Sequence, residues 1–262
     1  TQKGPAHWRA TLVQRGYQEA ITYSFVDPKL QQLVDPGQSP VALANPISSE
    51  LAVMRTNLWP GLLRAAQYNL NRQQTRIRFF EHGLTYVKQD NELKQESYLG
   101  GVVSGLLHPE QWGLSQAAAD FFDVKADIEA VLAAGGGLAA FTFRAAQHPA
   151  LHPARTARVL RHDQPVGWLG NVHPELAKIL ELPEDTILFE LATAAMENGR
   201  MARFEEISRY PAIRRDLAFV IPRAVTAEAL SAAVTAAAGG LLQDLTLFDV
   251  YEGKGLESGR KS

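Results

Sequence analysis

Cysteine is absent from the 262 residues of this chain, and its absence removes several kinds of site at once. Structural disulfides, zinc sites with thiolate ligands, iron–sulfur clusters and cysteine nucleophiles all need this residue. A chain of this length can bury a core without cross-links, so stability does not depend on them. We therefore expect a globular protein compatible with a reducing compartment, and its expected location is cytoplasmic.

Long apolar runs and a strong excess of one charge are also missing. No run approaches the roughly 20 apolar residues of a membrane span, so we expect no membrane partner. The 26 basic and 28 acidic residues leave a formal net charge of -2. This balance excludes a surface that coats nucleic acid throughout, but it permits a local basic face. The chain starts at Thr1 without an initiator Met and stops at Ser262, and we expect both ends to continue in a longer protein.

Familiar catalytic motifs are missing too. No G-x-S-x-G elbow of a serine hydrolase occurs. The terminal GLESGRKS resembles a phosphate-binding loop, but Arg260 replaces the glycine before the lysine and no helix follows, which favours a surface turn. Glu81 and His82 are adjacent in an expected strand, so their side chains face opposite sides and cannot act as an acid/base pair. We assign no catalytic residue.

The histidines follow a pattern that favours turns over metal binding. His148 and His152 are four residues apart, the spacing that would bring two ligands together on a helix. Pro149 and Pro153 break any helix there, so we expect structural turns. We assign no metal-ligating residue.

The residues that are present predict an α+β fold with a mainly antiparallel sheet. Apolar periodicity predicts a helix over 56–73 and another that begins at 123 with Asp123 as its cap. Alternation of Ile21, Tyr23 and Phe25 predicts a strand. Further expected strands cover 76–87 with a break at Gly83, 97–107 with glycines that allow close packing, 156–172 as a pair, and 186–191.

A polar and small-residue stretch over 192–203 predicts a domain boundary, with one domain over 1–200 and a second over 204–262. In the second domain, the segments RDLAFVI, TAEALSAAVTAAAGG and LLQDLTLFDVYEG predict strand, helix and strand. This is the first half of a ferredoxin-like unit, which would need two more strands and a helix. We expect such a truncated β-α-β unit to be marginally stable.

Arginines gather near this boundary among aromatic residues, a composition that suits phosphate contact with base stacking. The candidates for RNA contact are Arg209, Arg214 and Arg215, and strand alternation would place Arg214 and Arg215 on opposite faces. A solvated or ion-paired face is the alternative, because nearby acidic residues dilute the positive charge.

Several segments, in this order, resemble the bacterial phenylalanyl-tRNA synthetase β-subunit family over essentially the whole chain. They are RGYQEAITYSFVDP, NPISSELAVMRTNLWPGLLRAAQYNLNR, IRFFEHGLTY, FFDVKADIEAVL, HPAR, GWLGNVHPEL, RYPAIRRDLAFVI and LFDVYEGKGLESGRKS. The resemblance implies a class II synthetase-like antiparallel sheet flanked by helices, followed by the start of a ferredoxin-fold anticodon-binding domain.

The resemblance further implies an (αβ)2 enzyme in which the α subunit activates phenylalanine with ATP and magnesium and charges tRNA(Phe). This fragment would then serve α-subunit assembly and tRNA binding, with no cofactor and no active site of its own. Residues 83–87 support this, because they lack the arginine that contacts ATP in catalytic relatives. We expect the helix over 58–72 to contact the α subunit.

Two alternatives stay open. One is a self-sufficient adenylate-forming ligase whose terminal glycine-rich stretch completes an active site, and the missing arginine argues against it. The other is a structural partner module without RNA contact, which differs from the first interpretation only in the role of the arginines.

Overall fold

A computed structural model describes residues 4–89, 92–135, 137–197, 204, 206 and 209–262. The chain divides into two compact units, Thr1–Arg203 and Phe204–Ser262. Each unit is described separately below.

The first unit is built on a seven-stranded sheet with the order β1-β4-β5-β9-β8-β7-β6. All neighbours are antiparallel except β1 and β4, so the sheet is mixed and not wholly antiparallel. The strands are β1 (Gln18–Glu19), β4 (Arg76–Gln89), β5 (Glu92–Gly105), β6 (Phe141–Ala145), β7 (Leu151–Arg161), β8 (Gln164–Val172) and β9 (Ile187–Ala192).

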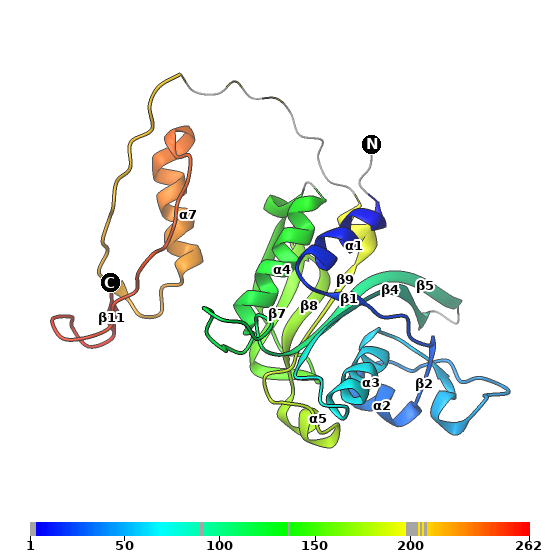
Figure 1. Cartoon of the computed structure of the whole chain (residues 1–262). Coiled ribbons are helices and arrows are strands. Elements are labelled where there is room, and N and C mark those ends of the chain that lie inside the picture. Colours follow the sequence, from blue (N-terminus) through cyan, green and yellow to red (C-terminus); the bar gives the residue numbers. More distant parts are fainter. Residues whose placement is uncertain (1–3, 90–91, 136, 198–203, 205, 207–208) are drawn as a thin grey trace. The chain divides into compact units, whose positions relative to one another are not determined.

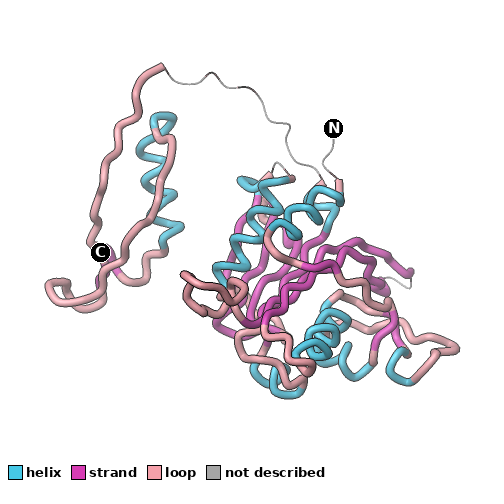
Figure 2. Tube along the Cα trace, in the orientation of Figure 1, coloured by secondary structure: helices cyan, strands magenta, loops and turns pink. Residues whose placement is uncertain are grey.

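Helices cover both faces of this sheet, as Figures 1 and 2 show. The core on one face includes residues of α1 (Pro5–Gln14) and α4 (Phe121–Ala134). The core on the other face includes residues of α2 (Pro28–Val34), α3 (Trp59–Leu70) and α5 (Pro174–Ile179). The short helices α6 (Thr193–Met196), η1 (Ser49–Leu51) and η2 (Leu138–Ala140) complete the unit. We call the second face the α3 side.

Local sequence signals explain where the main helices begin and end. Pro60 lies in the first turn of α3, where a missing N–H costs nothing. The cap of α4 is Asp120, which accepts the backbone N–H groups of Phe122 and Asp123. Asp123 is therefore not the cap, as its position suggested; its side chain accepts the Asp120 N–H and completes a capping box. Gly16, with φ +83°, follows the end of α1.

Glycines of β5 allow the close packing that the sequence predicts. A Cβ at Gly101 would lie 2.3 Å from the ring of Phe189, and one at Gly100 would lie 3.2 Å from Leu58. The predicted break at Gly83 is wrong, because Gly83 pairs with Tyr98 within the continuous ladder of β4 and β5.

The strand predicted around Ile21 and Tyr23 is only partly formed. Two short strands flank this stretch: β1 before it and β2 (Phe25–Val26) after it, where β2 pairs with β3 (Val53–Met54). Residues 20–24 between them are not in a strand. The Ala20 N–H donates to the Phe80 carbonyl and the Ser24 carbonyl accepts the Arg55 N–H, so the backbone is held at the two ends of the stretch without forming a strand ladder.

The second unit contains one helix, α7 (Ala227–Ala238), a short η3 (Gly239–Leu241) and the two-residue pair β10 (Ile221–Pro222) with β11 (Arg260–Lys261). Figure 2 shows it mostly as loop around that helix. Most of the predicted first strand and the whole of the predicted second strand are not formed. None of the described residues of this unit is buried.

Among the residues that the structure describes, no helix is both long and apolar enough to cross a membrane.

Candidate functional site

The pairing register of the sheet places a row of chemically distinctive residues on the α3 side. Residues directly opposite each other in neighbouring strands point to the same face. The row, named here the Glu190 row, consists of Glu81, Gly100, Glu190, Trp168, Arg158 and Arg144.

A buried ion pair occupies one end of the row. Arg55 donates from Nη1 to Glu81 Oε1 over 2.8 Å, and both side chains are at most 4% exposed. Arg55 also donates from Nε to the carbonyl of Leu84 over 2.9 Å. The hydroxyl of Thr22 donates to Glu81 Oε2 over 2.7 Å, which fixes the stretch 20–24 to the sheet. Breaking such a pair costs free energy, because it leaves a buried charge without its partner. The cluster therefore holds Arg55, Glu81 and Thr22 in fixed positions relative to one another.

Glu190 lies in the middle of the row and is buried. Its Oε1 accepts the backbone N–H of Leu58 over 2.7 Å, at the start of α3. Burial raises the pKa of Glu190 to about 8, and the hydrogen bond from Leu58 only partly offsets this. The carboxyl is therefore mostly protonated at neutral pH.

Aromatic rings surround the other half of the row. The ring of His148 lies 5.1 Å from that of Trp59 and 4.9 Å from that of Trp168, both edge to face. Burial lowers the pKa of His148 to about 4, so this imidazole is neutral at pH 7. The guanidinium of Arg158 lies over Trp168, 4.2 Å from the ring centre.

A second polar cluster lies on the opposite face, around Asp127 of α4. Its carboxylate accepts from Arg78 over 2.9 Å and from the hydroxyl of Tyr17 over 2.8 Å, and it also pairs with Arg15. Because Asp127 already has three donors, this cluster ties α1, α4 and β4 together and has no group free for chemistry.

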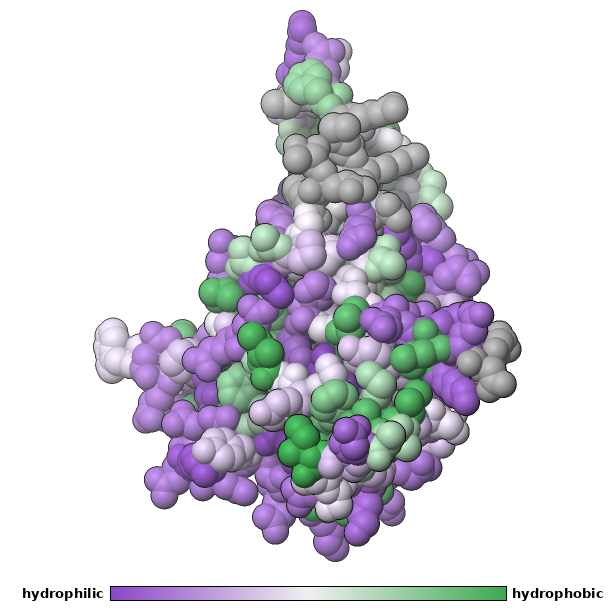
Figure 3. Space-filling model, turned by 90° about the vertical axis from the view of Figure 1, so that its right-hand side faces the viewer, coloured by the Kyte–Doolittle hydropathy of each residue, from purple (hydrophilic) through white to green (hydrophobic). Residues whose placement is uncertain are grey.

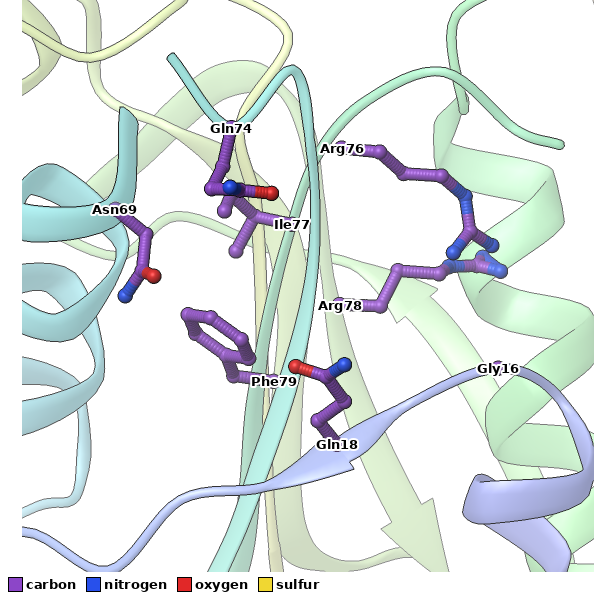
Figure 4. A pocket seen from close by; sticks show the side chains of 8 residues that line it. All are labelled: Gly16, Gln18, Asn69, Gln74, Arg76, Ile77, Arg78 and Phe79. Carbon is purple, nitrogen blue, oxygen red and sulfur yellow. The ribbon is translucent and has the colours of Figure 1, made fainter. Parts of the chain in front are cut away.

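A small polar cavity of about 90 Å³ lies beside this cluster, between β1 and β4. Figure 4 shows Arg76 and Arg78 on one side of β4 and Asn69 and Gln74 on the other, so these groups do not converge on one point. The volume is also far below the roughly 300 Å³ at which ligand pockets begin. The cavity suits a few water molecules.

Comparison with known proteins gives the family. Residues 1–193 match the model described as "Phenylalanyl tRNA synthetase beta chain CLM domain", and residues 208–262 match "Ferredoxin-fold anticodon binding domain". The chain belongs to the phenylalanyl-tRNA synthetase β-chain family. This finding confirms the resemblance that the sequence segments carry.

Relatives in this family are named "Phenylalanine--tRNA ligase beta subunit". That of Pseudomonas syringae pv. tomato is 55% identical over 254 residues, which are 97% of this chain and 32% of the relative. That of Nitrosococcus oceani is 51% identical over 255 residues, with the same shares of 97% and 32%. The chain therefore spans about a third of the length of the curated relatives it matches.

Solved structures agree on the fold. The pyrrolysyl-tRNA synthetase PylSc of Desulfitobacterium hafniense superposes with a TM-score of 0.57 at 16% identity, covering 73% of this chain and 63% of that one. A second structure of the enzyme from the same organism gives 0.55 at 16% identity, with shares of 73% and 66%. The synthetase-like fold is thus shown, and this likeness carries nothing further.

The predicted turn forms at His148, whereas the prediction of a turn at His152 is wrong, because His152 lies inside β7 where the pairing register shifts between Leu151 and Thr156. Nδ1 of His148 accepts the N–H of Ala150, and Nδ1 of His152 accepts that of Ala154, over 3.2 and 3.1 Å. His173 caps α5 in the same way, toward the N–H of Glu175. Each imidazole accepts two residues ahead while proline fixes the following backbone, as Asx turns do.

Glu81 and His82 face opposite sides of the sheet, as predicted. Glu81 contacts Arg55 on the α3 side, whereas His82 Nε2 lies 2.9 Å from Ser97 Oγ on the α1 side. The terminal glycine-rich segment is the predicted turn: Tyr251 and Ser262 exchange backbone hydrogen bonds across it.

The three arginines that the sequence marks for RNA contact all lie on the surface of the second unit. Arg209 pairs with Glu206 over 3.4 Å, and Arg214 pairs with Asp216 over 3.4 Å. Arg215 is exposed. The prediction that a strand directs Arg214 and Arg215 to opposite faces is wrong, because no strand forms there. Of the wider arginine group, Arg200 and Arg203 lie outside the described residues.

Sequence reasoning missed the Glu190 row. Its clearest signal was Glu190 itself, a single carboxylate inside the apolar segment ILFEL. Arg158 and Trp168 had no such signal, since only the pairing of β7 with β8 brings them together.

Proposed function

We propose that the chain is the part of a phenylalanine–tRNA ligase β subunit that holds the α subunit and binds tRNA(Phe), without an active site of its own. The observation that carries this proposal is the order of the two family matches, a synthetase-like domain followed by an anticodon-binding domain. In the whole enzyme, an (αβ)2 assembly in the cytoplasm, the α subunit binds ATP and magnesium and attaches phenylalanine to tRNA.

On the α3 side, Arg55, Glu81 and Glu190 are paired or neutralised, which supports the proposal that this chain has no active site of its own. Forming an acyl-adenylate needs cations aimed at a triphosphate and carboxylates free to hold magnesium. Here Arg55 and Glu81 neutralise each other, and Glu190 accepts from Leu58 and is mostly protonated. Residues 83–87 supply no arginine. Within the described ranges, no three histidine, aspartate or glutamate side chains gather as a metal site requires.

The stretch 20–24, which belongs to no strand and is named here the docking segment, is our candidate contact with the α subunit. Thr22 anchors it through Glu81, while Ile21 and Tyr23 are 92% and 72% exposed. A fixed segment that belongs to no strand suits pairing with a strand of another chain. Figure 3 shows apolar side chains among hydrophilic ones on the face where β2 and the β4–β5 hairpin lie in Figure 1.

The apolar stripe of α3 is unsuited to this contact. Leu58, Leu62, Leu63 and Ala66 are all buried within the chain. The exposed side of the helix carries polar groups such as Arg64 and the half-exposed Tyr68. We therefore move the expected contact with the α subunit from the helix to the docking segment.

Assembly with an α subunit tests the proposal. The chain is mixed with the α subunit that accompanies the Pseudomonas syringae β subunit and analysed by size-exclusion chromatography. We expect co-elution, loss of co-elution in the double variant Ile21→Asp/Tyr23→Asp, and retention in Ile179→Asp, which alters an exposed apolar residue of α5 (56% exposed). No co-elution of the unaltered chain contradicts the assembly role.

Catalysis by the chain alone is tested separately. Phenylalanine-dependent exchange of pyrophosphate into ATP by the isolated chain should stay at background. Turnover above background would instead support the self-sufficient adenylate-forming ligase.

The surface arginines support the tRNA role. The ion pairs of Arg209 and Arg214 are exposed and long, at 3.4 Å, and such pairs contribute about 0–1 kcal/mol, so a phosphate can displace them. The same ion pairs also favour the second candidate, a structural module without RNA contact. Filter binding of tRNA to the complex of this chain with the α subunit distinguishes the two candidates. A structural module without RNA contact should show no salt-dependent binding of tRNA.

A further inference from the structure

Arg158 differs from the other buried or half-buried arginines among the described residues in forming neither a hydrogen bond nor an ion pair. Within the described ranges, the buried or half-buried arginines other than Arg158 each donate a hydrogen bond or form an ion pair; they are Arg9, Arg55, Arg76, Arg78 and Arg161. The structure gives the guanidinium of Arg158 a cation–π contact, and no carboxylate among the described residues pairs with it. Arg158 is half-buried, and its side-chain N–H groups are not among the buried donors that lack a partner, so they remain accessible to an acceptor from solution.

The groups around Arg158 do not neutralise it. Glu190, two strands away in the row, is mostly protonated at pH 7 because burial raises its pKa to about 8. His148 is neutral, and burial raises the pKa of the Tyr98 phenol, so that group is neutral too. The exposed Glu96 accepts the Tyr98 hydroxyl over 2.9 Å. Among the described residues, neither Glu96 nor Asp35, whose charge acts on His148 and Glu190, pairs with Arg158, so its guanidinium keeps its N–H groups for another acceptor.

The guanidinium is also held in place. It lies over Trp168 at 4.2 Å, and Trp168 is packed against His148, which in turn packs against the buried Trp59. Stacking on Trp168 fixes the plane of the guanidinium. Its N–H groups point outward in that plane, where they can donate to an acceptor. Carboxylates and phosphates suit this geometry, because two of their oxygens can accept two parallel N–H groups.

We propose that Arg158 and Trp168 form a binding site for a small oxyanion, a carboxylate or a phosphate, on the α3 side of the sheet. The site does not depend on the proposed function, because it rests on one arginine, its stacking partner and the lack of any hydrogen-bond or ion-pair partner for that arginine among the described residues.

Isothermal titration calorimetry with the 262-residue chain tests the site at pH 7. The titrants are inorganic phosphate, AMP and acetate, each at an ionic strength held constant with sodium chloride. We expect at least one to bind saturably with a Kd of about 1–10 mM. Binding of acetate alone identifies a carboxylate site, and binding of phosphate or AMP alone identifies a phosphate site.

Substitutions assign the binding to the stacked arginine. Arg158→Gln should raise the Kd at least tenfold. Arg158→Lys keeps the charge but loses the planar fork, so its Kd should lie between those of the unaltered chain and Arg158→Gln. The matched control is Arg144→Gln, since Arg144 lies opposite Arg158 on the same face but is exposed and paired with Asp163. Its Kd should equal that of the unaltered chain.

A folding control keeps the test decisive. The thermal midpoint of each variant is measured without anions, and Trp168→Phe serves as a second variant if Arg158→Gln does not fold; it too should weaken binding. Three results would overturn the proposal: no saturable binding of any titrant, an unchanged Kd in the folded Arg158 and Trp168 variants, or an equal loss in Arg144→Gln, which would indicate a general cationic surface.

Discussion

The two units of this chain use similar residues with different results. The first buries large side chains on both faces of its sheet, such as Trp8 and Phe80 on one side and Trp59 and Leu62 on the other. The second is also rich in apolar residues, yet none of its described residues is buried, and Phe248 is 68% exposed. Apolar content is therefore not sufficient for a core.

Strand pairing accounts for the difference. In the first unit each long strand has neighbours, and the paired sheet supplies two surfaces on which helices pack. In the second, the alternating segments 213–220 and 242–250 form no strand. A ferredoxin-like unit places further strands and a second helix beside such segments, and the described residues of this unit do not include them.

The largest expected effect comes from truncating a matched pair of phenylalanines, one in each unit. Phe80→Ala should destabilise the first unit by about 3–5 kcal/mol, because a fully buried ring leaves a cavity. Phe248→Ala should leave the second unit unchanged. Amide hydrogen exchange measured by mass spectrometry follows both units at once, with faster exchange throughout 4–197 in the first variant only. Faster exchange of α7 in the second variant would show that this unit has a core.

The pH dependence of stability should also belong to the first unit, through Glu190. Its pKa is raised to about 8 in the folded chain from an unfolded value near 4.5. The folded state therefore holds the proton more tightly, and stability falls as pH rises through this range. His148, with a pKa lowered to about 4, has the opposite effect below about 6.5. His82, whose pKa burial also lowers, acts in the same direction as His148, so Glu190 gives the main effect between pH 6.5 and 8.

Urea unfolding across pH 6.5–8 measures this slope, which should be roughly 1 kcal/mol per pH unit. Glu190→Gln should remove it, because the amide keeps an acceptor for the Leu58 N–H but does not titrate. Glu228→Gln, at an exposed position of α7, is the matched control and should keep the slope. A slope that survives in Glu190→Gln would assign it to another group.

Features that depend on neighbouring residues could be predicted from the sequence, whereas features that depend on the pairing of distant strands could not. The helix α3, the turn at His148 and the start of α5 at His173 were predictable, because caps, prolines and apolar periodicity act within a few residues. The strand around Ile21 was not, since alternation cannot tell whether a partner strand exists. The Arg55–Glu81 pair and the Glu190 row depend on register between distant strands, which no local pattern encodes.

Two glycines give a smaller test of the packing difference. A Cβ at Gly101 would lie 2.3 Å from the Phe189 ring, so Gly101→Ala should destabilise the first unit by about 1–3 kcal/mol. Nothing lies within 4 Å of a Cβ at Gly240, and Gly240→Ala should change stability by less than about 0.5 kcal/mol. Thermal unfolding of both variants checks this. Equal shifts would mean that the second unit is packed as tightly as the first.

The smallest expected effect on folding, and the one that bears most on function, concerns Arg214 and Arg215. Both are exposed, so replacing either with alanine should leave the unfolding free energy within about 0.5 kcal/mol. If one of them contacts a tRNA phosphate, its loss weakens binding and lowers the slope of log K against log salt by about one. Filter binding to the chain assembled with the α subunit, at several salt concentrations, measures this slope.

Arg223→Ala, which removes another exposed arginine paired with Glu252 over 2.8 Å, is the control. Unchanged slopes in both Arg214 and Arg215 variants would remove these residues from the RNA surface, because a phosphate contact cannot be lost without releasing fewer counterions.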